Sequence, residues 1–160
     1  CAYSKIALGW TTPTVIDVGT HLIEQAQTSP MAFRINQGFP SGEYLLIENR
    51  QPVGFDGIMP QGGLCIWHID EAISTNSNEA HPKVALAQAD GDDDLGNAVN
   101  RGDAGDPYPG SSGNTTFDKN STPRSRSYAG RDTCVAVTSI SASASTMTAD
   151  LRVAGAKSFV

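Results

Sequence analysis

Apolar and polar residues alternate with a period of two along most of the chain. The run MAFRINQ, for example, places Met31, Phe33 and Ile35 on one side of an extended backbone. This alternation is typical of a strand that buries one face. The last segment with this pattern contains SASAS at its centre, which predicts a turn between two strands. The segments that the pattern predicts to be strands are 14–25, 31–37, 43–51, 62–70, 81–90 and the two halves of 133–155.

Two parts of the chain do not alternate. Residues 1–9 read as a short helix, which Gly9 and the nearby Pro13 would end. Residues 91–132 show little periodicity and form a loop of unusual length for a compact domain, so we expect this loop to be functional or to be held by something other than a core. Seven or eight strands with turns between them predict a mainly β fold, namely a jelly-roll-like β-sandwich with a short N-terminal helix and long irregular loops. We expect residues 1–14 to be a helix and linker at the end of a preceding domain, which the resemblance described below implies is catalytic, and residues 15–160 to be the β-sandwich domain.

Within GGLCIWHID, the same alternation assigns each side chain to a face of the strand. One face carries Leu64, Ile66 and His68, and the residues between them occupy the other. His68 is of interest because Asp70 and Glu71 follow it closely. A lone histidine in a strand is more often a hydrogen-bonded structural residue than a ligand, and the remaining histidines, His21 and His81, are far away in the sequence.

The segment 84–110, VALAQADGDDDLGNAVNRGDAGDPYPG, is rich in aspartate and contains no glutamate. Carboxylates this close repel one another unless a cation or solvent offsets their charge. The start of the segment resembles an EF-hand loop, but Leu95 replaces the turn glycine and Arg101 replaces the bidentate glutamate. A calcium site of another kind and a solvated acidic loop both remain open from spacing alone. The calcium site would use four aspartates, Asp90, Asp94, Asp103 and Asp106.

The charge balance narrows the range of partners. Lysine and arginine number 11 against 17 acidic residues, which gives a net charge of −6. An acidic chain without a basic cluster argues against nucleic acid and anionic membranes as partners. No apolar run approaches the roughly 18 residues that a bilayer span needs.

The cysteines are Cys1, Cys65 and Cys134. Because Cys65 and Cys134 both lie in strand-like runs, a disulfide between them and two buried free thiols are both compatible with the sequence. The chain opens at Cys1 inside what reads as a helix, so we expect a fragment of a longer protein.

Motifs for familiar catalytic chemistries are missing from the sequence. There is no HExxH zinc motif, and GSSGN does not match a GxSxG nucleophile elbow. We therefore assign no catalytic residue. Aromatic side chains could instead line a sugar-binding face, and the candidates are Trp10, Tyr44, Trp67, Tyr108 and Phe117.

Six motifs together resemble one family. In chain order they are AYSKIALGW, EYLLIENRQ, GFDGIMPQGGLCIWHIDE, HPKVALAQADGDDDL, GDAGDPYPG and TPRSRSYAG. Their order resembles the M6 peptidases, the immune-inhibitor-A-like secreted bacterial zinc metalloproteases, across nearly all of residues 2–153. In that family the zinc-binding HExxH and the methionine turn lie upstream of a segment like AYSKIALGW, so the resemblance implies that zinc belongs to a parent catalytic domain outside this chain.

The resemblance also bears on calcium and function. The family is calcium-stabilised, which favours the calcium site at Asp90, Asp94, Asp103 and Asp106, whereas Asp92 and Asp93 fall in a variable part of its pattern. It implies a secreted accessory β-domain that stabilises the upstream protease domain of the same polypeptide and cleaves nothing alone. The alternative is an extracellular structural or adhesive module, such as a self-assembling surface or fibre subunit or a glycan-binding module, with exposed edge strands near the C-terminal TADLRVAGAKSFV.

Overall fold

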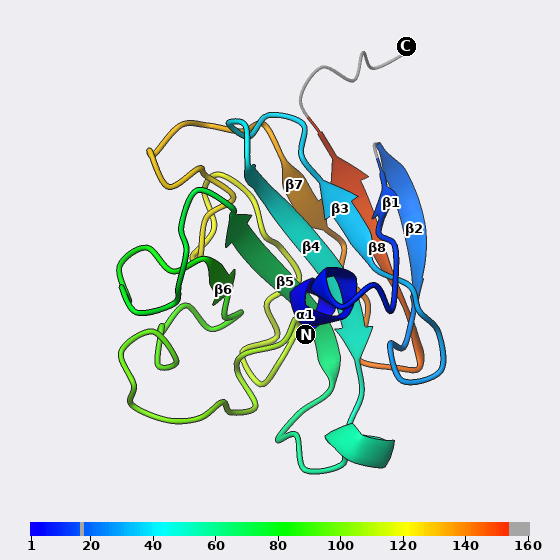
Figure 1. Cartoon of the computed structure of the whole chain (residues 1–160). Coiled ribbons are helices and arrows are strands. Elements are labelled where there is room, and N and C mark those ends of the chain that lie inside the picture. Colours follow the sequence, from blue (N-terminus) through cyan, green and yellow to red (C-terminus); the bar gives the residue numbers. More distant parts are fainter. Residues whose placement is uncertain (17, 154–160) are drawn as a thin grey trace.

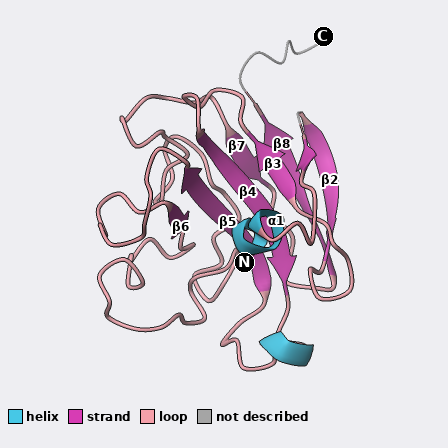
Figure 2. Cartoon of the chain, in the orientation of Figure 1, coloured by secondary structure: helices cyan, strands magenta, loops and turns pink. Residues whose placement is uncertain are grey.

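The strands of this protein form two sheets (Figures 1 and 2). The computed structural model describes residues 1–16 and 18–153. Within these residues, the three-stranded sheet has the order β2 (Gly19–Glu24), β8 (Thr146–Arg152) and β7 (Ala136–Thr138). The five-stranded sheet has the order β1 (Thr14–Val15), β3 (Phe33–Ile35), β4 (Glu43–Arg50), β5 (Gly63–Asp70) and β6 (Val84–Leu86).

The two sheets share one apolar core. Ile23 of β2 and Met147 of β8 lie in the same buried cluster as Ile47 of β4 and Ile66 of β5. Each of these side chains is fully buried, as the period-two pattern requires when one face of each sheet turns inward. The prediction of a mainly β fold with a short N-terminal helix and long loops is confirmed. The shared core is consistent with the predicted jelly-roll-like β-sandwich, which stays a prediction.

Strand β4 is buried on both faces. Leu45 and Ile47 point into the shared core, whereas Tyr44 and Leu46 belong to a second cluster that includes Ala2 of the helix α1 (Ala2–Ala7). α1 lies over the outer face of the five-stranded sheet (Figure 1). This cover explains why EYLLIENRQ reads as a continuous apolar run rather than as a strict alternation.

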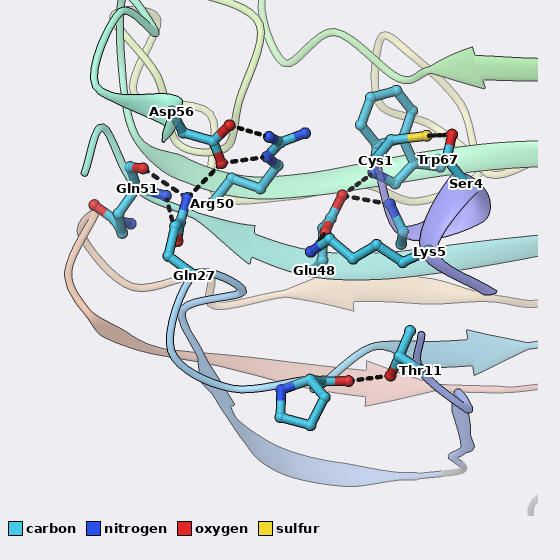
Figure 3. Close-up of polar contacts among 12 residues, drawn as sticks. Cys1, Ser4, Lys5, Thr11, Gln27, Glu48, Arg50, Gln51, Asp56 and Trp67 are labelled. Atoms are coloured by element: carbon cyan, nitrogen blue, oxygen red, sulfur yellow. Dashed lines mark hydrogen bonds and ion pairs between the residues drawn. The ribbon is translucent and has the colours of Figure 1, made fainter. Parts of the chain in front are cut away.

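The side chain of Glu48 fixes α1 on the sheet, although this carboxylate is fully buried. Its Oε1 accepts hydrogen bonds from the Ala2 backbone N–H at 2.7 Å and from Trp67 Nε1 at 3.0 Å. Its Oε2 lies 3.2 Å from the ammonium of Lys5 (Figure 3). The charge is therefore paired and hydrogen-bonded, which is what burial of a carboxylate demands.

Two predicted strands differ from the observed ones. The predicted strand 81–90 forms the β-ladder only over β6, because the chain then leaves β5 and Ala89 N–H donates to Asp106 O at 2.9 Å instead. An exposed edge at the C-terminal strand would support the alternative of a self-assembling module, but β8 pairs with β2 on one side and with β7 on the other. Residues 154–160 of that prediction lie outside the described residues.

The boundary predicted between residues 14 and 15 falls inside β1. β1 pairs in parallel with β3, so the segment after α1 joins the five-stranded sheet directly. No helix in the described part of the chain is long and apolar enough to cross a membrane.

All three cysteines are free thiols. The disulfide that the sequence allowed between Cys65 and Cys134 is not formed, because Cys65 lies in β5 of one sheet and Cys134 precedes β7 of the other. Cys65 is buried as the alternative expected, but Cys134 is exposed. Burial raises the pKa of the Cys65 thiol to about 12, so this cysteine stays protonated and unreactive at neutral pH.

Candidate functional site

The acidic loop begins and ends at paired backbone segments. Ala89 N–H donates to Asp106 O at 2.9 Å, and Asp90 N–H donates to Gly105 O at 3.2 Å. Asp90 and Asp106 therefore lie at the neck of the loop. A side chain at Gly105 would collide with Asp90 Oδ2, so the glycine allows that carboxylate to lie directly over the backbone.

Asn100 links two of the predicted aspartates. Its Nδ2 donates to Asp94 Oδ2 at 3.0 Å and to Asp103 Oδ2 at 2.8 Å, while its Oδ1 accepts from Gly102 N–H at 2.7 Å. The side-chain amide thus supplies donors to carboxylates that would otherwise repel one another. Nothing in the spacing of the aspartates identified Asn100 as the residue that joins them.

Asp106 is the most buried of the four predicted aspartates, with 5% of its surface exposed. Its Oδ2 accepts a hydrogen bond from Asp103 N–H at 2.7 Å. Its Oδ1 is buried and has no hydrogen-bond partner among the described residues. Burial raises the pKa of the Asp106 carboxyl above its usual value, and the charges of Asp103, Asp90 and Asp94 raise it further. The hydrogen bond from Asp103 N–H acts in the opposite direction, but Oδ1 of an ionised Asp106 is left without a partner among the described residues.

The four aspartates do not form a complete metal site. In the part of the chain that the structure describes, no group of three or more histidine, cysteine, aspartate or glutamate side chains is placed to hold a metal ion. The loop brings Asp94 and Asp103 together through Asn100, and Asp103 and Asp106 together through a backbone hydrogen bond. One buried oxygen without a partner fits a cation, but a complete coordination shell is not formed, and calcium stays a prediction.

The remaining aspartates of the segment do not join this arrangement in the same way. Asp92 is exposed, and its backbone N–H donates to Asp90 Oδ1 at 3.1 Å. Asp93 Oδ1 accepts a hydrogen bond from Gln88 Nε2 at 3.2 Å. Both aspartates therefore lie outside the neck formed by Asp90 and Asp106.

The structure brings together two histidines that are far apart in the sequence. Tyr128 stacks between them: its ring centroid lies 4.3 Å from that of His68 and 3.8 Å from that of His81. His68 comes from β5 and His81 from the loop before β6. The stack therefore joins the loop that carries Tyr128 to the end of the five-stranded sheet.

Each of these histidines has a carboxylate partner. His68 Nε2 lies 2.7 Å from Glu43 Oε1, and His81 Nε2 lies 2.8 Å from Asp70 Oδ2. Glu43 Oε1 also accepts a hydrogen bond from Tyr128 N–H at 2.8 Å. The sequence placed His68 beside Asp70, but the partner is Glu43, which opposes Asp70 across the β4–β5 pair. The contact between His68 and Glu43 depends on how β4 pairs with β5, which short-range spacing in the sequence does not reveal.

The His68 pair predicts a dependence of stability on pH. Burial lowers the pKa of His68 below its ordinary 6.5, although Glu43 and Asp70 act in the opposite direction. The unfolded chain therefore takes up a proton near pH 6.5 that the folded protein accepts only at lower pH, so stability falls as the pH falls below 6.5. We expect the melting temperature of the wild type to decrease more than that of His68→Gln between about pH 7.5 and pH 5.5. Equal decreases would show that other groups cause the effect.

The predicted sugar-binding face is not formed. Tyr108 and Phe117 are fully buried in the shared core, and Tyr44 is buried under α1, whereas Trp10 is exposed. Trp67 is partly buried and donates its N–H to Glu48. Because these side chains face different parts of the molecule, they do not form one aromatic platform.

Comparisons with family models, with curated proteins and with solved structures find no match. The resemblance to M6 peptidases therefore stays a prediction from the six motifs. Two features of the structure bear on function, namely the buried Asp106 Oδ1 without a partner among the described residues and the exposed apolar side chains near α1 and on the β4–β5 loop.

Proposed function

We propose that this chain is the accessory β-domain of a secreted M6-like zinc metalloprotease, in which calcium stabilises the acidic loop. It supports an upstream protease domain of the same polypeptide and has no peptidase activity of its own. The single observation that carries the calcium part is the buried Asp106 Oδ1, which has no hydrogen-bond partner among the described residues.

A calcium ion would correct the imbalance of charge in the loop. Calcium takes six to eight oxygen ligands from carboxylates, backbone carbonyls and water. Asp106 Oδ1 offers a free ligand atom, and the carboxylate oxygens of Asp90, Asp94 and Asp103 keep a second lone pair beside the hydrogen bonds that they accept. The nearby charges that raise the pKa of Asp106 would then be shared by a dication.

Exposed apolar side chains support the proposal that another domain contacts this chain. Leu8 and Trp10 follow α1 and are 60% and 71% exposed. Phe55 and Ile58 are almost fully exposed on the β4–β5 loop, which is held by an ion pair between Arg50 and Asp56, shown in Figure 3. A contiguous patch of large exposed apolar side chains is typical of a surface that another protein covers, and we propose that these side chains belong to such a surface.

Calcium titration tests the first part of the proposal. Millimolar calcium should raise the melting temperature of the wild type relative to the same protein in chelator. A concentration about a hundred times the dissociation constant stabilises the folded state by about 2.7 kcal/mol. Asp106→Asn should abolish most of this calcium-dependent increase, because it removes the buried charge that the ion compensates, and differential scanning calorimetry measures the shift.

Asp92→Asn is the matched control, because it makes the same change in the same loop at an exposed side chain. It should leave the calcium-dependent shift nearly unchanged. A wild type whose melting temperature is the same in calcium and in chelator would refute the calcium site. Equal loss of the shift in Asp92→Asn and Asp106→Asn would place the ion elsewhere or make its effect nonspecific.

The protease part has a separate test. The reading frame upstream of the codon for Cys1 should encode HExxH followed by a methionine turn. The isolated chain, given zinc and calcium, should not hydrolyse casein. An upstream frame without the zinc motif, or hydrolysis by the chain alone that a zinc chelator stops, would contradict this part while leaving the calcium result intact.

A further inference from the structure

Strand β6 is the outermost strand of its sheet (Figure 1). Ala87 N–H donates to Ile66 O, and Asp70 N–H donates to Lys83 O, each at 2.9 Å. With this register, Ala85 exchanges hydrogen bonds with β5, and the backbone groups of Val84 and Leu86 point away from it. The outer edge of β6 thus presents these two residues to the surroundings.

The two residues differ in whether their outward groups are bonded. The Asn76 side chain accepts from Val84 N–H at 3.1 Å and donates to Val84 O at 2.9 Å, so its amide takes the place of a neighbouring strand. For Leu86, no hydrogen bond to the backbone N–H or C=O is formed within residues 1–16 and 18–153. The Leu86 N–H and C=O can therefore pair with the backbone of an added strand, next to Val84, whose outward groups are already bonded to Asn76.

A pocket of about 500 Å³ lies along this edge. Its lining includes Trp67 from the outer face of the sheet and Tyr128 from the inner side, so the pocket spans the strand edge itself. One wall contains Asn76. The other wall is the segment around Leu95, which is held because Leu95 N–H donates to Gln88 Oε1 at 3.2 Å.

The acidic lining of the pocket favours a basic ligand. Glu79 and Asp93 line it, and no lysine or arginine of the described chain does so. Both residues are exposed, and Asp93 accepts a hydrogen bond from Gln88. Carboxylates without a cationic partner at the rim attract a basic ligand and repel a second copy of this acidic chain.

We propose that this groove binds an extended basic peptide, which adds a strand to the outer edge of β6. The peptide exchanges two backbone hydrogen bonds with Leu86, and its apolar side chains contact Trp67 on one side and Tyr128 on the other. Its lysine or arginine side chains lie near Glu79 and Asp93. Strand addition of this kind takes affinity from main-chain hydrogen bonds and specificity from pockets for alternate side chains. The inference does not require the proposed calcium ion or the protease.

A short peptide of alternating lysine and valine is the probe. We expect saturable binding to the full chain, with the backbone amide signal of Leu86 shifted in the NMR spectrum and slowed in hydrogen exchange. Leu86→Pro removes the outward N–H without removing a bond to β5, and it should weaken binding about fivefold, the effect of one lost hydrogen bond. Leu86→Ala keeps the N–H and should bind more tightly than Leu86→Pro.

Three further comparisons make the test decisive. A probe with N-methylated backbone amides should not bind, and a glutamate–valine peptide should bind more weakly than the lysine–valine peptide. Glu79→Gln should reduce this preference for the basic peptide without changing the circular dichroism spectrum. Absence of saturable binding, or equal binding of the methylated probe, would overturn the proposal. Self-association that shifts the Leu86 signal without any peptide would replace it with pairing between copies.

Discussion

Replacing Glu48 by alanine should lower the free energy of unfolding by about 3 kcal/mol. The substitution leaves the Ala2 backbone N–H and the indole N–H of Trp67 without their acceptor, and it removes the partner of Lys5. α1 should then detach from β4, because this carboxylate is its polar anchor on the sheet. Chemical denaturation followed by tryptophan fluorescence measures both effects, in a Trp10→Phe background that leaves Trp67 as the single tryptophan.

Glu48→Gln is the matched control for this change. The glutamine keeps an oxygen acceptor for Ala2 and Trp67 but loses the charge that faces Lys5. Since Lys5 is partly exposed and its ion pair is screened by solvent, we expect glutamine to cost less than alanine. A Glu48→Ala protein as stable as the wild type would show that α1 is held by apolar contacts alone.

Replacing Ile66 by alanine should destabilise the protein by about 2 to 5 kcal/mol. Ile66 is fully buried at the centre of the core that the two sheets share. The shorter side chain loses its transfer free energy and leaves a cavity, because both sheets hold their backbone in register around it. Urea denaturation at equilibrium measures this loss.

Ile58→Ala makes the identical chemical change at a side chain that is 95% exposed. Its effect on the free energy of unfolding should stay within about 0.5 kcal/mol. Similar losses at Ile58 and Ile66 would mean that the β4–β5 loop is packed in solution, against either this chain or a second copy.

The strands of the five-stranded sheet could be predicted well where their side chains alternate. Leu64, Ile66 and His68 lie on the inner face of β5, as the alternation indicated. Phe33 and Ile35 likewise enter the shared core from β3. These predictions succeed because a period of two fixes which side of a strand each residue occupies, whatever the partner strand is.

Contacts between distant segments could not be predicted in this way. β6 is shorter than its pattern suggested, because Ala89 and Asp90 pair with the returning end of the acidic loop. His68 bonds to Glu43 rather than to the nearby Asp70, since strand register brings β4 alongside β5. Both outcomes depend on pairing across the chain, about which local spacing carries little information.

The sequence predicted which aspartates belong to the candidate site, but it did not predict most of the contacts between them. The four aspartates do lie in one loop, and Asp90 and Asp106 meet at its neck. The role of Asn100 was missed, because the spacing of two carboxylates does not indicate which amide donates hydrogen bonds to both of them. The burial of Asp106 also depends on packing that only the folded chain creates.

The side chain of Gln88 forms hydrogen bonds that connect the acidic loop to the groove beside β6. Its amide holds Asp93 and Leu95 at once, and both residues line the groove while belonging to the acidic loop. A ligand that orders either region would therefore lower the entropy cost of ordering the other. If both proposed ligands bind, thermodynamic reciprocity requires that calcium strengthen peptide binding by the same factor by which the peptide strengthens calcium binding. Under the two proposals, the affinity of the sheet edge for a peptide would therefore vary with the calcium concentration around the protein.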